Sequence, residues 1–231
     1  MQLDELESFL RARLGQPLPG PRAQWRFAPR PARKGWDPGQ TPDEARKAAA
    51  LLLVYPGDEG PTIPFTVRRH DLPEHAGQVS FPGGRIDPGE RPEEAAIREA
   101  HEEIGVDPAS IRLVGPLSSL WVVVSNHLVQ PFVAIAPERP RFRLAEREVA
   151  ELVEAPLAHV RDEARVEWQK VVRDGMLIDY PSFDLGGHRV WGATAMMLGE
   201  FVCLFDDRFG ERVAPATRGP VAYEPPRPLN R

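Results

Sequence analysis

This sequence of 231 residues contains a single cysteine, Cys203, so it cannot form an intramolecular disulfide bond. It also lacks any apolar run near the roughly 20 residues that a membrane-spanning helix requires. Residues 1–15 lack the cationic start and apolar centre of a secretory signal peptide. These absences argue against a disulfide-stabilised or membrane protein, and we expect a cytoplasmic location.

The sequence has no tract of basic residues, and its 29 Lys and Arg are mixed with 34 Asp and Glu, for a net charge of -5. Because nucleic-acid-binding proteins usually carry a basic surface or tail, we expect no nucleic acid partner. Its hydrophobic fraction of 42% allows a substantial globular core. The 26 prolines concentrate in residues 17–38 and 215–228, which we therefore expect to be irregular or extended.

Apolar segments and turn-forming residues predict strands interleaved with helices. The predicted helices cover residues 3–14, a start at Thr41-Pro42, 92–104, about 157–161 and 194–204. The predicted strands cover residues 48–55, 64–69, 111–117, 121–125, 128–136 and 148–154, with a hairpin formed by 167–174 and 176–181. This order favours an α/β fold with a mixed sheet covered on both faces. We expect three parts: an N-terminal helix and Pro/Arg-rich extension (1–45), a catalytic domain (46–209) and a Pro-rich tail (210–231).

The most informative segment is residues 84–106, GRIDPGERPEEAAIREAHEEIGV. In a helix, Glu99, Glu102 and Glu103 lie on one face because residues three and four apart are neighbours. An isolated E-x-x-E-E is more often a solvated surface, but here it stands within a longer pattern of specified residues. Crowded carboxylates repel one another unless a cation holds them, and oxygen ligands suit Mg2+ or Mn2+. The segment therefore predicts a divalent metal site.

Neighbouring residues fit the same interpretation. Arg98 keeps its positive charge, and it can pair with Glu94 or Glu102 on the helix or with Glu90 in the preceding loop. Pro92 suits the first helical position, and Gly105 suits the end of the helix.

The pattern G-x5-E-x7-R-E-U-x-E-E-x-G-U, where U is apolar, resembles the signature of the Nudix hydrolases. This resemblance implies an α/β/α sandwich and metal-dependent cleavage of a diphosphate linked to another moiety. It also implies that Glu99, Glu102 and Glu103 act as metal ligands and catalytic groups, joined by the backbone carbonyl of Gly83. Arg98 is expected to hold the loop and its carboxylates.

A second segment resembles the coenzyme A pyrophosphatase branch of this family. Its matching residues are Thr66, Arg68, Gly77, Phe81, Pro82, Gly83 and Gly84, and the run Trp191 to Ala195 is also similar. The resemblance covers roughly residues 51–205. It implies that Arg68, Gly77, Gln78 and Phe81 contact the substrate. Hydrolysis of coenzyme A would release 3',5'-ADP and 4'-phosphopantetheine, or its acyl form.

The sequence departs from that branch at several positions. Pro64 and Phe65 replace two leucines, Arg69 replaces a small residue, and Pro73 replaces an arginine that would help to hold the phosphates. Arg69, or the nearby His75, is a candidate to replace that arginine.

Several alternatives remain open at this point. The proton acceptor in hydrolysis can be Glu102, Glu103, or a glutamate from a distant segment, for which Glu148 and Glu151 are candidates. The substrate can be another nucleoside diphosphate derivative, such as ADP-ribose, a dinucleotide or an oxidised nucleoside triphosphate. A non-catalytic nucleotide-binding module should have lost a metal carboxylate, whereas this sequence keeps all three. An interaction protein that uses the proline-rich ends is a further alternative, and the family resemblance allows a homodimer.

Overall fold

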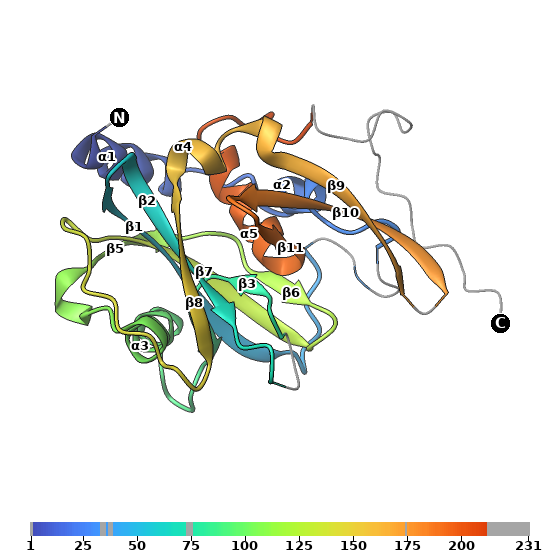
Figure 1. The fold of residues 1–231 in the computed structure, drawn as a ribbon, viewed down its shortest axis with the longest axis horizontal. Coiled ribbons are helices and arrows are strands. Elements are labelled where there is room, and N and C mark those ends of the chain that lie inside the picture. The colour runs from blue at the N-terminus through green and yellow to red at the C-terminus, as the bar shows by residue number, and fades with distance from the viewer. Residues whose placement is uncertain (1, 33–35, 37–38, 73–75, 174, 212–231) are drawn as a thin grey trace.

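A computed structural model describes residues 2–32, 36, 39–72, 76–173 and 175–211 (Figure 1). Its α-helices are α1 (Leu3–Leu14), α2 (Gly20–Arg26), α3 (Pro92–Ile104), α4 (Leu157–Val160) and α5 (Gly192–Cys203), and two short 3-10 helices cover Pro108–Ser110 and Glu163–Arg165. Its strands are β1 (Arg46–Gly57), β2 (Gly60–Arg68), β3 (Val79–Ser80), β4 (Gly83–Arg85), β5 (Arg112–Pro116), β6 (Leu120–Val122), β7 (His127–Ile135), β8 (Val149–Pro156), β9 (Val166–Arg173), β10 (Met176–Leu185) and β11 (His188–Trp191). The predicted mixture of helices and strands is therefore confirmed.

The centre of the molecule is a mixed eight-stranded sheet with the path β3-β2-β1-β7-β5. Strands β4, β6 and β8 join this path by pairing with β1, β7 and β2, respectively. Strand β1 runs parallel to β7, from Arg46 opposite His127 to Val54 opposite Ile135, whereas its pairings with β2 and β4 are antiparallel. Because β1 lies in the middle, it fixes the position of both neighbouring segments that carry the predicted site.

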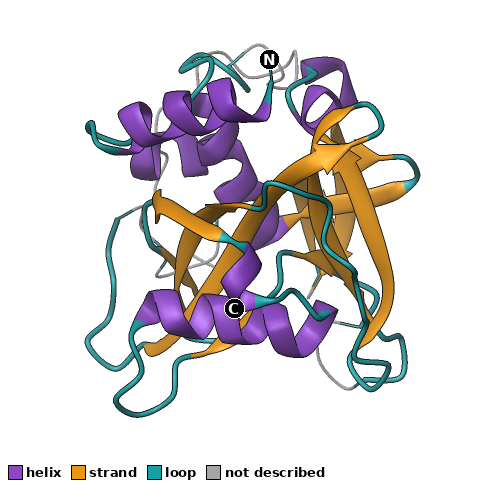
Figure 2. Cartoon of the chain, turned by 90° about the vertical axis from the view of Figure 1, so that its left-hand side faces the viewer, coloured by secondary structure: helices purple, strands orange, loops and turns teal. Residues whose placement is uncertain are grey.

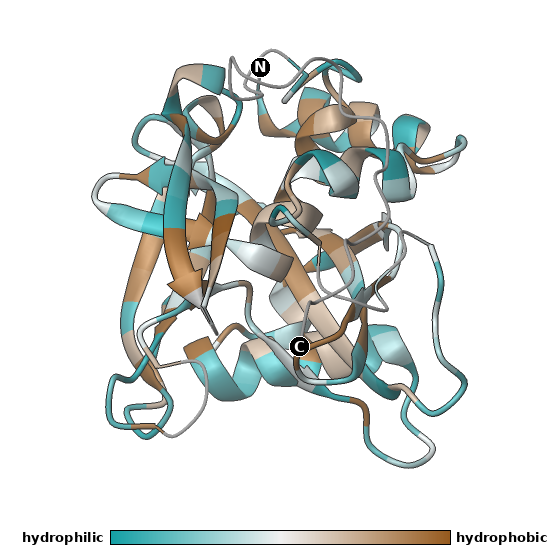
Figure 3. Ribbon diagram, turned by 90° about the vertical axis from the view of Figure 1, so that its right-hand side faces the viewer, coloured by the Kyte–Doolittle hydropathy of each residue, from teal (hydrophilic) through white to brown (hydrophobic). Residues whose placement is uncertain are grey.

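Alternate side chains of β1 enter two separate cores. Leu51 and Leu53 pack in one core with Ala96 of α3, whereas Leu52 packs in the other with Phe27 and Phe201. Successive side chains of a strand point to opposite faces, so helices must cover both sides of the sheet. Figures 1 and 2 show this arrangement, which confirms the α/β/α sandwich. In Figure 3 the inner strands carry mainly hydrophobic colouring and the surrounding loops mainly hydrophilic colouring.

A second sheet has the strand order β11-β10-β9. The hairpin of β9 and β10 extends away from the central sheet (Figure 1). Met176 lies opposite Arg173, which confirms the predicted hairpin; the predicted turn residue Asp174 lies outside the described residues. Strand β11 was not predicted from the sequence.

The N-terminal region differs from the prediction in two places. Helix α1 forms where expected, but the proline-rich connector contains the additional helix α2. The prediction of a helix start at Thr41-Pro42 is wrong. The chain makes only a turn there, in which the Ala45 N–H donates to the Pro42 carbonyl. Strand β1 begins at Arg46, because from this residue onward its backbone pairs with β7 and no longer forms a turn.

The N-terminal helices contribute directly to the core. Leu6, Leu10 and Phe27 are almost fully buried. The division of the chain into three parts stays a prediction, and its C-terminal tail lies largely in residues 212–231, outside the described residues. Within the described part of the chain, no helix is both long and apolar enough to cross a membrane.

Candidate active site

Helix α3 has the ends that the sequence predicts. The Glu94 carboxylate accepts a hydrogen bond from the Arg91 backbone N–H at 3.1 Å, and Pro92 occupies the first turn. At the other end, Gly105 adopts a left-handed conformation with φ of 73°. A side chain at Gly105 would also meet the backbone of Arg143, so this glycine both ends the helix and leaves room for a second segment.

Two glycines bring strand β4 against the glutamates of α3. A Cβ atom on Gly83 would lie 2.5 Å from the Ala49 carbonyl oxygen, because β4 pairs closely with β1. On Gly84, a Cβ atom would lie 2.3 Å from Oε1 of Glu99. Both distances are far below ordinary contact, so a side chain at Gly83 would displace the strand and one at Gly84 would displace the Glu99 carboxylate from its present place.

Arg98 holds the loop before α3 and two of the three glutamates. Its Nε lies 2.8 Å from Glu90 Oε1, its Nη1 lies 2.8 Å from Glu99 Oε1, and the same Nη1 lies 3.2 Å from Glu102 Oε2. A further bond reaches the Arg85 carbonyl oxygen at 2.9 Å. The predicted pairings with Glu90 and Glu102 are confirmed. The alternative pairing with Glu94 is wrong, because Arg91 binds that carboxylate.

The glutamates of α3 differ strongly in their surroundings. The pKa of Glu103 is raised to about 8, mainly by burial and also by the negative charges of Glu99 and Glu148. The hydrogen bond from the Gly83 N–H and the charge of Arg68 oppose this rise. Burial also raises the pKa of Glu99, although the hydrogen bond from Arg98 lowers it. Two neighbouring carboxylates that resist ionisation form a site that a bound cation would stabilise.

A buried oxygen supports the same interpretation. Oε2 of Glu103 is inaccessible to solvent and has no hydrogen-bond partner. Among the described residues, no three Asp, Glu, His or Cys side chains already stand in an arrangement that encloses a metal ion. Arg98 binds Glu99 and Glu102 instead, so closure around a cation requires Glu102, which is 56% exposed, to change partner. The donor set of Glu99, Glu102 and Glu103 fits a hard divalent ion.

A segment distant in sequence crosses the end of α3. The N–H of Arg143 donates to the Ile104 carbonyl at 2.9 Å, and the N–H of Ala145 donates to the Glu103 carbonyl at 2.8 Å. The segment continues to Glu148, whose charge raises the pKa of both Glu99 and Glu103. Sequence reasoning named Glu148 as a candidate, but nothing in the sequence indicated this crossing.

Glu148 and Glu151, the two distant candidates for the proton acceptor, have different surroundings in the structure. Glu151 points elsewhere, with Oε1 at 3.2 Å from Nε2 of His188. A register shift in the pairing of β2 with β8 places Val67 opposite Glu151 and Arg68 opposite Val149. Glu148 precedes β8 at this irregularity, and its charge acts on Glu99 and Glu103. Glu151 lies within the strand and is paired with His188.

The residues with predicted substrate contacts are Arg68 at the end of β2, Gly77 and Gln78 in the loop before β3, and Phe81 just after β3. Arg68 ends β2, and its positive charge lowers the pKa of Glu103. The backbone of Arg68 is bonded to both Gln78 and Gly77, at 2.9 and 3.0 Å. Phe81 is buried and stacks on Phe65 with ring centroids 5.0 Å apart, so its observed role is in the core. Substrate contact by these four residues stays a prediction.

Arg69, one of the departures from the expected pattern, is engaged within the protein. Its Nε and Nη2 lie 2.8 and 2.7 Å from the Asp71 carboxylate, and its Nη1 lies 2.9 Å from the Glu146 carbonyl oxygen. Pro73, which replaces the expected arginine, and His75, the other candidate to substitute for it, lie outside the described residues.

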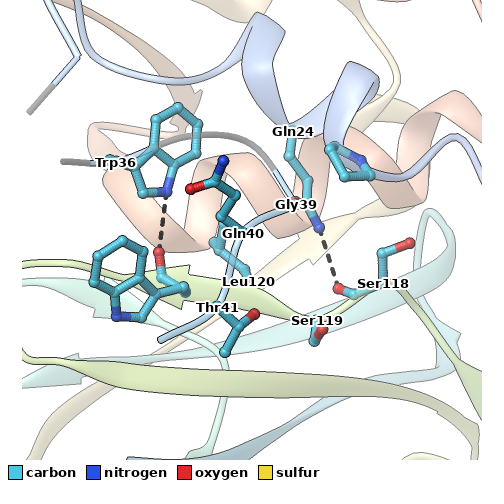
Figure 4. A pocket seen from close by; sticks show the side chains of 10 residues that line it. Gln24, Trp36, Gly39, Gln40, Thr41, Ser118, Ser119 and Leu120 are labelled. Carbon is cyan, nitrogen blue, oxygen red and sulfur yellow. Dashed lines mark hydrogen bonds between the residues drawn. The ribbon is translucent and has the colours of Figure 1, made fainter. Parts of the chain in front are cut away.

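A hollow of about 160 Å³ lies away from these residues, between α2 and β6 (Figure 4). Its polar wall is stabilised by the buried carboxylate of Glu200, which accepts hydrogen bonds from Gln24 and from the Ser118 N–H at 2.8 and 3.1 Å. The lining residues are Pro21, Gln24, Trp36, Gly39, Gln40, Thr41, Ser118, Ser119, Leu120 and Trp121. None of the predicted site residues is among them.

Comparison with known proteins finds a family model and relatives that carry the same family name. The NUDIX domain matches residues 36–174 of this chain. An uncharacterized Nudix hydrolase, NudL, from Yersinia enterocolitica is 33% identical over 162 residues, which cover 70% of this chain and 82% of the relative. NudL of Pectobacterium atrosepticum is 34% identical over 177 residues, covering 74% and 89%. Nudix hydrolase 15, mitochondrial, from Arabidopsis thaliana is 33% identical over 163 residues, covering 66% and 56%. Among solved structures, the Ap4A hydrolase binary complex of C. elegans shows 21% identity and a TM-score of 0.42, covering 48% of this chain and 80% of that one.

Proposed function

Because this chain belongs to the NUDIX domain family, we propose that it is a divalent-metal-dependent hydrolase of coenzyme A or acyl-coenzyme A. The observation that carries the hydrolase assignment is the seating of Glu99 and Glu103. Their carboxylates lie against Gly84 and Gly83 with raised pKa values and one unpaired buried oxygen. A solvated surface helix has none of these features.

The residues suited to the metal are Glu99, Glu102 and Glu103, with the Gly83 carbonyl as the family resemblance implies. Mg2+ or Mn2+ bound there would neutralise diphosphate charge and lower the pKa of a bound water. Arg98 keeps the loop of Glu90 against the helix, so that the carboxylates remain aligned.

Glu148 is the best candidate to accept the proton. It is exposed, and its charge is felt by both Glu99 and Glu103. In the proposed reaction, a water oxygen forms a bond to one phosphorus while the bond from that phosphorus to the bridging oxygen breaks. Glu148 takes the proton of the attacking water, and the second phosphate leaves with the bridging oxygen.

The coenzyme A assignment rests on the segment upstream of the glutamate helix. The positive charge of Arg68, at the end of β2, acts on Glu103 and would also attract a diphosphate held at the cluster. Residues 77–84 pair with β2 through β3 and with β1 through β4, and Phe81 packs in the core against Phe65. In this proposal Gly77 and Gln78 of the same segment contact the substrate. The products of this proposed reaction are 3',5'-ADP and 4'-phosphopantetheine or its acyl form.

One observation favours a second substrate class. The arginine typical of the coenzyme A branch is replaced by Pro73, and the guanidinium of Arg69 is already bound to Asp71. Hydrolysis of another nucleoside diphosphate derivative, such as ADP-ribose or a dinucleotide, would not depend on that arginine.

The test is a substrate panel with the purified chain. Coenzyme A, acetyl-coenzyme A, ADP-ribose, NADH and a nucleoside triphosphate are incubated with Mg2+ or Mn2+, and the products are separated by chromatography. Preferred release of 3',5'-ADP from coenzyme A supports the proposal. Preferred cleavage of another diphosphate refutes the coenzyme A assignment but retains the hydrolase, and absence of all metal-dependent turnover refutes both. Parallel reactions with EDTA show whether turnover depends on metal.

A further inference from the structure

The first residue after β2, Arg69, joins two loops at the candidate site. Its backbone N–H donates to the Glu148 carbonyl at 3.0 Å, and its Nη1 donates to the Glu146 carbonyl at 2.9 Å. The remaining face of the guanidinium is bound by both oxygens of Asp71, at 2.7 and 2.8 Å. Arg69 therefore holds the 146–148 turn at two points, and Asp71 fixes the direction of its side chain.

The same turn is anchored from its other side. Ala145 donates to the Glu103 carbonyl of α3, and the N–H groups of Glu148 and Val149 both donate to the Ala145 carbonyl at 2.9 Å. The backbone of Glu148 is thus connected by hydrogen bonds to the end of α3, through Ala145, and to Arg69. The Glu148 side chain is exposed, so its position depends on these backbone anchors and not on core packing.

We propose that Arg69 is a positioning residue that aligns Glu148 with the glutamates of α3 for proton transfer. This role rests on the proposed function, because it requires Glu148 to be the proton acceptor. It is specific to this sequence, since the resembling branch carries a small residue at this position. A small residue would keep the backbone bond to Glu148 but lose the side-chain bond to Glu146.

Direct phosphate binding by Arg69 is less consistent with the contacts. The guanidinium forms a two-bond pair with the Asp71 carboxylate, which neutralises its charge locally. Its third contact is also made within the protein. A phosphate would have to displace Asp71, whereas the positioning role uses the contacts that are present.

The pair is too exposed to be a major source of stability. The Arg69 and Asp71 side chains are 41% and 64% exposed, and exposed ion pairs contribute little to folding. Loss of the pair should therefore change turnover much more than it changes the melting temperature.

The experiment uses the full chain and the fastest substrate among coenzyme A, ADP-ribose and NADH. We compare Arg69→Ser, Arg69→Lys, Asp71→Asn, Glu148→Gln and the double variant Arg69→Ser/Glu148→Gln. Arg139→Ser is the matched control, because Arg139 makes a similar two-bond pair with Glu154 at the far end of β1. For each variant, kcat, KM and the melting temperature are measured.

We expect Arg69→Ser to lower kcat by about 10-fold or more with little change in KM, because small displacements of a catalytic group cost about that much or more. Arg69→Lys keeps one donor and should recover part of the loss. Asp71→Asn should lower kcat in the same direction. In the Glu148→Gln background, Arg69→Ser should change kcat by less than about twofold, because the residue through which it acts is already disabled. Arg139→Ser should have wild-type kinetics.

Other outcomes distinguish an error in the role of Arg69 from an error in the assignment of Glu148 as the base. A rise in KM, with equal effects of Arg69→Ser in both backgrounds, would show phosphate binding and overturn the positioning role while retaining Glu148 as the base. Wild-type turnover by Glu148→Gln would refute the base assignment and this role, but not the hydrolase. If Arg69→Ser fails to fold, Asp71→Asn decides: wild-type kcat in that variant overturns the role.

Discussion

At the scale of single residues, Gly84 and Glu103 distinguish the acidic face of α3 from an ordinary solvated helix surface. Gly84 leaves the space that the Glu99 carboxylate occupies, and Glu103 holds an oxygen without a partner. Burial of an unpaired carboxylate is unfavourable in a structural role, so its retention at this point indicates a functional one.

Glu103→Gln should lower turnover by at least about 100-fold, because it removes a charge from the metal site. The same substitution should stabilise the metal-free protein. Since the pKa of folded Glu103 is raised from 4.5 to about 8, ionisation costs stability as the pH rises between these values. Thermal melting in EDTA from pH 4.5 to 9 measures the effect, which should increase with pH and disappear when Mg2+ is added. A lower melting temperature at every pH would contradict this account.

Gly84→Ala should reduce both metal affinity and turnover while the fold persists. The new methyl group would overlap the Glu99 carboxylate, which must then move away from the cluster. Titration with Mn2+ followed by calorimetry measures the affinity, and circular dichroism monitors the fold. Gly15→Ala is the control, because Gly15 has φ of -78° and its nearest contact would be an ordinary 3.4 Å. Equal metal affinity in both variants would show that Glu99 is not a ligand.

At the scale of elements, helix α1 is tied to the sheet by a charged group. Glu7 binds Arg112 of β5 and also Arg11, at 2.8 Å, on its own helix. The hydrogen bond from Arg112 is the main reason that the pKa of Glu7 falls from 4.5 to about 2. The ionised form is thus favoured by folding, and α1 is part of the folded unit.

Glu7→Gln should therefore lower stability at neutral pH by about 1 kcal/mol, or about 2–4 °C in Tm. A depressed folded pKa stabilises the protein above the unfolded pKa, and this contribution is lost as the pH falls from 4.5 to about 2. Melting curves of variant and wild type should converge over that range. Turnover should not change, and Glu138→Gln controls for the loss of one exposed glutamate charge.

Elements with strong local signals were predictable from the sequence. Helix α3 has a proline start, a glycine end and a regular apolar stripe, and the structure gives it the predicted bounds. Helix α2 was hidden because proline and arginine dominate its surroundings, yet burial of Phe27 stabilises it. At Thr41-Pro42 the local signal for a helix was overridden by the pairing of β1 with β7.

The site was predictable only where its residues are close in sequence. The contacts of Arg98 with Glu90 and Glu102 follow from loop and helix spacing. The different surroundings of Glu148 and Glu151 depend on a register shift between β2 and β8, which no local pattern encodes. Burial of Phe81 against Phe65 likewise requires tertiary information.

At the scale of the whole molecule, the only cysteine of the sequence lies in the core that contains α5 and residues of the N-terminal helices. Cys203 is 1% exposed, and burial raises its pKa to about 11. We expect a disulfide reagent such as DTNB at pH 8 to react very slowly with the folded protein and rapidly in denaturant, because the thiolate is the reactive form. Absorbance at 412 nm measures the released thiol. Rapid reaction of the native protein would show that α5 opens readily.

The parallel pairing of β1 with β7 has a consequence for biosynthesis. During folding, residues 46–54 must pair with residues 127–135, and β2 must pair with β8 at residues 149–156. Such distant pairings make folding slow relative to local helix formation. A nascent chain that has reached residue 106 already contains every glutamate of α3, but neither of these sheet partners has yet been synthesised. Translation must pass residue 156 before the ribosome has supplied all the strands that align the cluster, so the site can be completed only late in synthesis.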